Sequence, residues 1–289
     1  MSEDFLERMA ESSRERVLAA MSERSHAEVL ARANATPVPP PLLAHSGGFD
    51  LIAEVKLRSP AAGLLKSSSE ENVGSRVTGY ATAGAAAISV LTEPSRFDGS
   101  MAHLESAASA LAAHRVPAMR KDFLVDPYQV SEARAAGAGG VLVILRMLPR
   151  AALEALIEQA LQLKLFALLE AFDERDIELA HSLAEQYGSS PSRPAIEGSV
   201  SLLVGVNCRD LVTLKVVPGR LEALAHLLPT NVPRVAESGV GSADDARRVA
   251  EAGYEFALVG SALMTAPDPH ALVTNMLKAG RSAHAERGA

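Results

Sequence analysis

The sequence has a single cysteine, Cys208, and no tryptophan among its 289 residues. One cysteine excludes an internal disulfide framework and is typical of the reducing cytosol. No apolar run reaches the roughly 18 residues that a membrane span needs, and the charged start MSEDFLERMAESSRER lacks the apolar segment of a signal peptide. We therefore expect a cytoplasmic protein without a membrane partner.

Several motifs of common functional sites are also absent. The eight histidines show no H-x-H or H-E-x-x-H spacing, so a metal site is not expected. No G-x-S-x-G nucleophile elbow occurs. The net charge of −7 argues against nucleic acid as a partner, because phosphate backbones select basic surfaces.

What the sequence contains is a regular alternation of short apolar runs and longer segments with helical spacing. Eight runs are predicted to be strands: 49–55, 86–91, 116–119, 140–145, 165–169, 201–206, 232–236 and 256–260. Several are continuously apolar, as parallel strands buried on both faces are. This pattern predicts a (β/α)₈ TIM barrel. A doubly wound open sheet is the competing fold, but its G-x-G-x-x-G fingerprint is missing.

Two segments depart from the alternation. Residues 3–34 carry apolar residues at helical spacing, which predicts one or two amphipathic helices that end before the prolines of TPVPPPLLA, residues 36–44. We expect a single barrel domain over residues 1–289, with residues 1–44 as an N-terminal helical extension. The Gly-, Ser- and Pro-rich residues 188–199 are predicted to be a loop insertion.

Polar residues follow the predicted strands at one end, where barrels of this type carry their active sites. They include Glu54 and Lys56, Lys121, Glu170, Asn207, Glu237 and Ser238, and Gly260 and Ser261. One charge at a strand end can simply mark contact with water, but the collective pattern indicates a site. Lys56 and Lys121 close together would repel, which lowers the pKa of one and suits a proton donor. Arg120 is predicted to point the opposite way and to pair with a neighbouring acid.

Seven segments together resemble the indole-3-glycerol phosphate synthase family. They are LIAEVKLRSP, ISVLTEPSRFDGS, RKDFLVDPYQVSEARAAGA, LLEAFDE, VGVNCRDL, VAESGV and LVGSALM, in the family's order and at every strand but the fourth. The resemblance implies a carboxy-lyase of tryptophan biosynthesis that needs no cofactor or metal. Its small phosphorylated substrate would be 1-(2-carboxyphenylamino)-1-deoxyribulose 5-phosphate, which closes to an indole with loss of CO₂ and water.

The resemblance also implies roles for individual residues. Lys121 would be the general acid that activates the substrate carbonyl, and Glu170 would act in the later dehydration. Lys56 and Glu54 would bind the carboxylate and share proton transfer, and Asn207 would steer the hydroxyls. The remaining contacts would be Ser59, Gly239, Gly260 and Ser261 to the phosphate, Phe123 and Leu142 to the aromatic ring, and Arg209 and Ser238 along the pocket.

Some features leave other functions open. SPAAG replaces the family's more usual SPSKG, which removes a lysine from the first loop, and Cys208 stands where Asn or Ser is more common. One alternative is a paralogue that acts on a related anilino-sugar phosphate. Another is a non-catalytic barrel that binds a phosphate ligand, although the five expected catalytic residues are all present. We expect the protein to act as a monomer.

Overall fold

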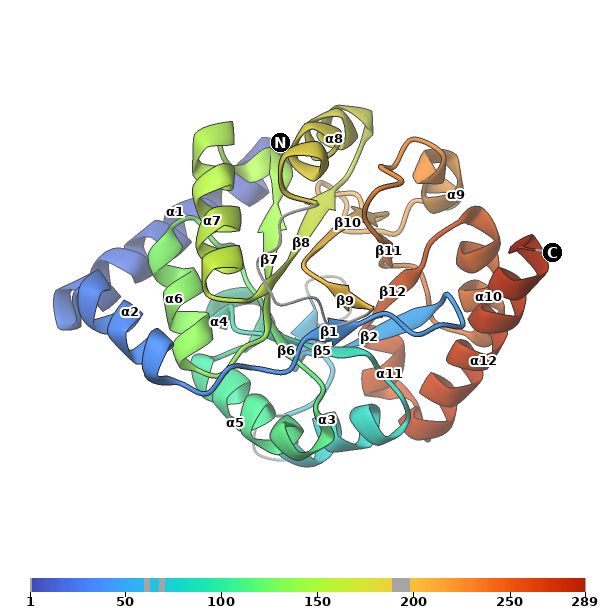
Figure 1. Cartoon of the computed structure of the whole chain (residues 1–289), viewed down its shortest axis with the longest axis horizontal. Coiled ribbons are helices and arrows are strands. Elements are labelled where there is room, and N and C mark those ends of the chain that lie inside the picture. Colours follow the sequence, from blue (N-terminus) through green and yellow to red (C-terminus); the bar gives the residue numbers. More distant parts are fainter. Residues whose placement is uncertain (1, 60–62, 68–70, 189–197, 289) are drawn as a thin grey trace.

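The computed structural model describes residues 2–59, 63–67, 71–188 and 198–288. These residues form a closed barrel of eight parallel strands in the order β10-β11-β12-β2-β5-β6-β7-β8. Figure 1 shows the helices arranged around this barrel. The (β/α)₈ barrel predicted from the alternation is therefore confirmed, and the open sheet is excluded.

Each barrel strand begins and ends within two residues of a predicted run. The strands are β2 (Asp50–Val55), β5 (Ala87–Leu91), β6 (Ala118–Lys121), β7 (Gly140–Ile144), β8 (Phe166–Ala171), β10 (Leu202–Asn207), β11 (Arg234–Glu237) and β12 (Phe256–Val259). The prediction of 116–119 for the third strand is wrong at both ends. Pro117 has no N–H for the ladder, so β6 starts after it, and Arg120 and Lys121 still pair in register with β5.

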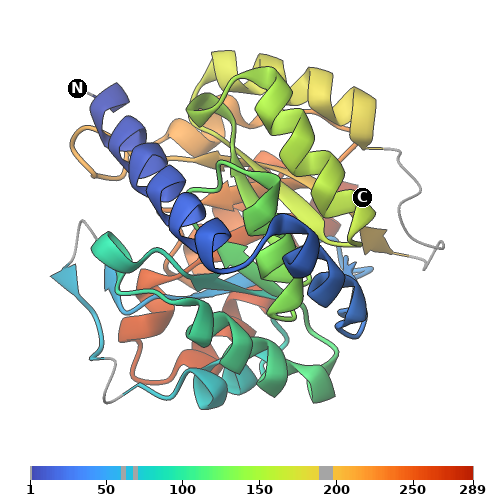
Figure 2. The same cartoon turned by 90° about the vertical axis from the view of Figure 1, so that its left-hand side faces the viewer.

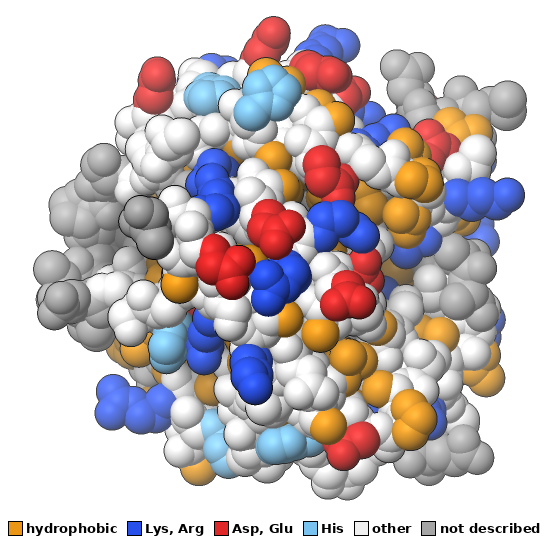
Figure 3. Space-filling model, turned by 90° about the vertical axis from the view of Figure 1, so that its right-hand side faces the viewer, with side chains coloured by type: hydrophobic (Ala, Val, Ile, Leu, Met, Phe, Trp, Pro, Cys, Tyr) orange, Lys and Arg blue, Asp and Glu red, His pale blue; other side chains and the backbone are white. Residues whose placement is uncertain are grey.

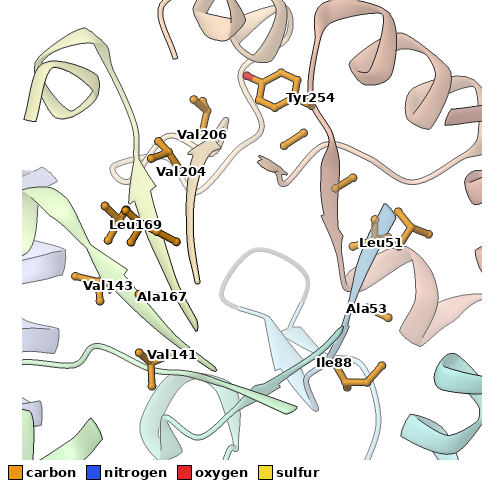
Figure 4. Packing of buried hydrophobic residues seen from close by; sticks show 14 of the residues in the cluster. Leu51, Ala53, Ile88, Val141, Val143, Ala167, Leu169, Val204, Val206 and Tyr254 are labelled. Atoms are coloured by element: carbon orange, nitrogen blue, oxygen red, sulfur yellow. The ribbon is translucent and has the colours of Figure 1, made fainter. Parts of the chain in front are cut away.

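Alternate strand residues face the helices and the barrel interior. In Figure 4, outward residues such as Leu51 and Ala53 lie between the strands and the surrounding helices, where they belong to the larger core cluster. Inward residues such as Ile52, Met119 and Leu142 form a second cluster inside the barrel. This period of two decides which polar side chains can reach the interior.

Helices follow the strands and cover them. They are α3 (Val73–Thr82), α4 (Pro94–Phe97), α5 (Met101–Leu111), α6 (Pro127–Ala135), α7 (Arg150–Gln162), α8 (Glu174–Tyr187), α9 (Arg220–Ala225), α10 (Ala243–Ala252), α11 (Ser261–Thr265) and α12 (Pro269–Gly288). Their outer faces mix both signs of charge, as Figure 3 shows for the side that carries α10 and α12. There Arg247 pairs with Glu286 at 3.4 Å. None of the helices that the structure describes has the length and hydropathy of a membrane span.

Two helices precede the barrel, as the spacing in residues 3–34 predicts. They are α1 (Ser2–Glu23) and α2 (His26–Ala35), and the second ends directly before the proline-rich segment. Arg16 attaches α1 to the barrel, because its guanidinium donates to both carboxylate oxygens of Asp122 at 2.9 and 2.8 Å. Gln129 adds a buried hydrogen bond to Ser13 at 2.9 Å.

Short strand pairs lie at the two ends of the barrel. At one end, β1 (Leu42–Leu43) pairs with β9 (Ser199–Val200), and Leu42 is fully buried against the inner cluster. At the other, β3 (Arg58–Ser59) and β4 (Gly63–Leu64) form a hairpin. Figure 2 shows this hairpin (light blue) near the start of α1 and the loop after β10 (orange), with β9 at the far side. Of the predicted insertion 188–199, residues 189–197 lie outside the described residues, and Ser199 belongs to β9.

Candidate active site

A cavity of about 170 Å³ opens at the carboxyl ends of the barrel strands. Its lining includes every residue that the sequence predicted for the site: Glu54, Lys56, Ser59, Lys121, Phe123, Leu142, Glu170, Asn207, Arg209, Ser238, Gly239, Gly260 and Ser261. Positions more than 200 residues apart in the chain therefore meet in one pocket, because the closed barrel brings all strand ends to one rim.

The polar residues lie on the last positions of the strands, not beyond them. Glu54, Lys121, Glu170 and Asn207 all fall within β2, β6, β8 and β10. Their backbones continue the ladder, and the inward parity of these positions turns the side chains to the cavity. The predicted runs for β6, β8 and β10 ended one or two residues too early for this reason, because a polar side chain that faces a site does not end a strand.

Lys121 is the centre of the polar network. Its Nζ donates to Oε2 of Glu170 at 3.1 Å and to Oε2 of Glu237 at 3.4 Å. Asn207 donates from Nδ2 to the other oxygen of Glu170 at 2.9 Å. Glu170 is thereby fixed between an ammonium and an amide, which orients both of its oxygens.

The expectation that lysine repulsion lowers a pKa at the site is wrong for Lys121. Burial by itself lowers the pKa of Lys121, but the charges of Glu170, Glu237 and Glu54 outweigh burial and raise that pKa above its ordinary value. Lys56 does not oppose this, because it is paired with Glu54 at 2.6 Å. Lys121 is therefore a charged ammonium at neutral pH, able to donate a proton to an acceptor in the cavity.

Glu237 is a member of this network to which the sequence reasoning gave no role. It is buried, and burial together with the nearby charge of Glu170 raises the pKa of Glu237 to about 8, although Lys121 opposes the shift. Its Oε1 has no hydrogen-bond partner within the described part of the chain. A signal was present in the sequence, since Glu237 is two residues after Val235 and so shares its inward parity.

Two glycines leave room for the buried carboxyl groups. A Cβ at Gly205 would overlap Oε1 of Glu237, and a Cβ at Gly260 would overlap Oε1 of Glu54. Gly205 lies in β10, in register with Glu170 of β8. Any larger residue at either position would displace a carboxyl group from its present place.

The loops after β11 and β12 supply small residues and backbone N–H groups on the same side of the cavity. Ser238 and Gly239 are both left-handed, with φ of 66° and 71°, which turns the chain sharply after Glu237. Gly260 and Ser261 follow β12 at the start of α11. Ser59 of β3 is buried close by. Loops at these two positions are where barrels of this kind often hold phosphate.

An aromatic wall lies at the outer part of the cavity. Phe123 contacts Phe5 of α1 edge-on, with ring centroids 6.0 Å apart, and Phe97 of α4 at 6.3 Å. Neither Phe5 nor Phe97 was predicted from the sequence to have a role in the site. The helices α1 and α4 bring these two rings to the cavity.

Two arginines near the site are engaged in structural contacts. Arg209 lines the cavity but donates from Nη1 to the carbonyl of Leu214 at 2.6 Å, which closes the loop after β10. Arg120 points away from the cavity and pairs with Asp122 and Glu132 at 3.3 Å each, so the prediction for its side chain is confirmed. Within the described ranges, no group of His, Cys, Asp and Glu side chains is arranged to hold a metal ion.

A sequence profile of the family described as indole-3-glycerol phosphate synthase matches residues 6–276. The chain belongs to this family. It is 39% identical to the indole-3-glycerol phosphate synthase of Mycolicibacterium gilvum over 281 residues, which cover 96% of both chains. It is also 39% identical to that of Saccharopolyspora erythraea over 255 residues, covering 88% of this chain and 87% of the relative.

Solved structures show the same architecture at low sequence identity. Thiamine phosphate pyrophosphorylase from Pyrococcus furiosus has a TM-score of 0.56 and 18% identity, covering 82% of this chain and 98% of its own. At this identity the likeness shows the barrel fold alone.

Of the two departures from the indole-3-glycerol phosphate synthase pattern, only Cys208 falls among the described residues. Ala61 and Ala62 of SPAAG lie outside the described residues. Cys208 is buried, and burial raises the pKa of its thiol to about 11, so the group is protonated at neutral pH. It packs against Gly239 behind the turn after β11.

Proposed function

We propose that this protein closes 1-(2-carboxyphenylamino)-1-deoxyribulose 5-phosphate to indole-3-glycerol phosphate, with loss of CO₂ and water. The observation that carries the proposal is the convergence of Lys121, Glu170 and Asn207 on one cavity that also contains an aromatic wall and phosphate-type loops. Family membership agrees with this function. The reaction is that of a carboxy-lyase.

The first step is carbon–carbon bond formation. The ring carbon that carries the carboxylate attacks the ribulose carbonyl carbon, which breaks the aromaticity of the ring and puts negative charge on the carbonyl oxygen. Lys121 protonates that oxygen, and its raised pKa keeps it charged until it meets this acceptor. Departure of CO₂ then restores the aromatic ring.

The second step is dehydration. The new hydroxyl must leave as water, and a proton must be taken from the ring system. Glu170 is placed for this transfer because Asn207 holds one of its oxygens and Lys121 the other. Glu237 gives Lys121 a second acceptor and so fixes the direction of its ammonium.

The substrate carries two anionic groups, a carboxylate and a phosphate, which bind at different parts of the cavity. Lys56 binds the carboxylate, and Glu54 holds Lys56 in place at 2.6 Å. Phe123 and Leu142 contact the aromatic ring. The phosphate lies against Ser59, Gly239, Gly260 and Ser261.

Product fluorescence tests the proposal. The chain has no tryptophan, so the indole of the product is the sole indole in the assay. We expect indole fluorescence to rise when the purified protein meets the carboxyphenylamino-deoxyribulose phosphate. Folded protein that gives no signal would contradict the proposal and leave the paralogue or the phosphate-binding barrel.

We also infer that the chain acts as one barrel domain over residues 1–289, with residues 1–44 as its N-terminal extension, as a monomer in the cytoplasm and without nucleic acid. The net charge of −7 and the attachment of α1 through Arg16 support this. Light scattering should give a mass near 30.3 kDa, and twice that value would contradict the monomer.

A further inference from the structure

Apolar side chains line the cavity on the side away from the loops assigned to the phosphate. In the closed barrel each strand lies opposite the strand four places further along the strand order. β11 and β12 therefore lie opposite β6 and β7, and β2 lies opposite β8. The apolar lining residues at the carboxyl ends of β6, β7 and β8 are Phe123, Leu142, Ile144 and Phe172. A substrate whose phosphate lies on the first side therefore has its aromatic ring on the second.

Phe172 is a fixed part of this apolar side. It directly follows β8 and is two residues from Glu170, so it shares the parity that turns Glu170 to the cavity. Its side chain is 3% exposed and packs within the inner cluster. Its N–H donates to Oδ2 of Asp176 at 2.8 Å. Both the backbone and the ring of Phe172 are therefore held at this point of the wall.

Arg146 supports the ring of Phe172 from behind. Its Cζ lies 4.8 Å from the ring centroid, which is the geometry of a cation–π contact. Its Nε donates to Oδ2 of Asp176 at 2.8 Å, and its Nη2 pairs with the same oxygen and with Asp173. Among the described residues that line the cavity, Phe172 is present and Arg146 is not. The guanidinium therefore lies on the side of the ring away from the cavity.

The two acids that hold Arg146 are themselves fixed by the start of α8. Asp173 is the N-cap of this helix, and its side chain accepts from the N–H of Asp176 at 3.2 Å. Carboxylates are stabilised at the N-terminus of a helix. Arg146 belongs to a short 3-10 helix, η2 (Leu145–Met147), directly after β7. The support thus joins the ends of two adjacent strands, β7 and β8, and leaves the ring of Phe172 little room to turn away from a ligand.

We propose that Phe172, supported by Arg146, limits the size of the aromatic ring that the cavity accepts. This inference rests on the proposed function. It narrows the substrate class to anilino-sugar phosphates whose ring carries no substituent on the side that faces Phe172, because extra atoms against a wall that cannot move are costly. Phe172 contacts the substrate ring, whereas Arg146 acts through Phe172 and is a positioning residue.

The test compares kcat/KM for the unsubstituted substrate with kcat/KM for analogues that carry a methyl group at each free ring position in turn. With the parent enzyme, at least one isomer should react about 10- to 200-fold less efficiently than the unsubstituted substrate. Phe172→Ala should reduce that difference to about threefold or less, because the space of its ring becomes available. Phe172→Leu should shift it in the same direction and serves if the alanine variant does not fold.

Phe166→Ala and Phe166→Leu are the matched controls. Phe166 lies at the other end of β8 and is equally buried in the inner cluster, but the cavity lining does not include it. These variants can lower stability, yet the ratio of kcat/KM between the methylated and unsubstituted substrates should stay as in the parent. Circular dichroism melting curves verify that each variant is folded.

The role of Arg146 is tested separately. Arg146→Gln keeps a donor for Asp176 but removes the charge over the ring of Phe172, so KM for the unsubstituted substrate should rise about 3- to 10-fold while kcat stays within about twofold. Arg146→Lys keeps the charge without the planar group and should give an intermediate KM. Arg150→Gln is the control, because it removes the same charge from an exposed pair with Glu154 on α7. Equal KM in Arg146→Gln and the parent would remove Arg146 from this role.

The outcomes separate this inference from the proposed function. An active parent enzyme whose ratios for the methylated substrates are unchanged in both Phe172 variants would overturn the size limit alone. A parent enzyme without turnover would overturn the proposed function, and the size limit would then be tested by calorimetry with anthranilate and its ring-methylated isomers. There it requires that Phe172→Ala bind a methylated isomer more tightly relative to anthranilate than the parent does. The same relative affinities, or no binding to the parent, would refute it.

Discussion

Gly205→Ala is the substitution that most sharply tests how the catalytic network is held together. Gly205 lies in β10, and its missing side chain leaves the space that the carboxyl group of Glu237 occupies. A Cβ there would overlap Oε1 of Glu237 by about 1 Å relative to the 3.4 Å of ordinary contact. The side chain of Leu168, 3.2 Å from the same point, limits movement on the other side.

The size of the effect follows from the Lys121–Glu237 hydrogen bond. At 3.4 Å it is already long, so a displacement of about 1 Å breaks it. Loss of a hydrogen bond to a charged group costs about 1.5 to 3 kcal/mol, which corresponds to a loss of about 10- to 100-fold in kcat if the bond orients Lys121 for proton donation. Overpacking of the interior should also lower the free energy of unfolding by about 1 to 3 kcal/mol.

The assay measures kcat by indole fluorescence and stability by urea unfolding. Gly79→Ala is the control, because Gly79 lies within α3 and a Cβ there meets nothing within 4 Å. It should leave turnover unchanged and stabilise the protein by about 0.5 to 1 kcal/mol. In a Glu237→Ala background, adding Gly205→Ala should cost little further activity. A Gly205→Ala enzyme with kcat within about twofold of the parent would refute the reasoning.

Three further predictions concern the same network and its support. Lys121→Ala and Glu170→Gln should each lower kcat at least about a hundredfold without unfolding the protein. The control Lys278→Ala, on α12, should leave kcat unchanged. Near-normal kcat in Lys121→Ala or in Glu170→Gln would remove that residue from the mechanism. Glu237 has a folded pKa of about 8 against an ordinary 4.5, so its contribution to stability is full below pH 4.5 and is lost as the pH rises through 8. Urea unfolding from pH 5 to 9 should therefore show a smaller loss of stability in Glu237→Gln than in the parent, and identical pH profiles would show that the carboxyl group is not perturbed. Arg16→Ala leaves the buried Asp122 with fewer partners and should lower the free energy of unfolding by about 2 to 4 kcal/mol. Arg14→Ala, at an exposed position two residues earlier in α1, should change it by less than about 0.5 kcal/mol.

The sequence predicted the barrel and the position of its site, because both follow from local patterns. Buried parallel strands appear in the sequence as apolar runs. Because the strands of a closed barrel run in the same direction, the residues at their carboxyl ends meet at one rim. The strand ends were less predictable. Glu170 and Asn207 look like the end of a strand in sequence, yet both remain in the ladder because their side chains face the cavity.

Features that depend on distances could not be read from the sequence. The pKa of Lys121 rises, and does not fall, because the carboxyl groups of Glu170 and Glu237 lie within hydrogen-bonding distance of its ammonium. Lys56 is paired with Glu54. Phe5 reaches the cavity because α1 lies against the barrel, where Arg16 and Ser13 bind Asp122 and Gln129.

The most direct test of the central claim follows the carbon that leaves. Substrate labelled with ¹³C in its ring carboxylate should release labelled CO₂ in a one-to-one ratio with the indole formed by the parent enzyme. Lys121→Ala should abolish both signals together. Indole without labelled CO₂, or neither product from folded parent protein, would contradict the proposal that this cavity carries out the ring closure.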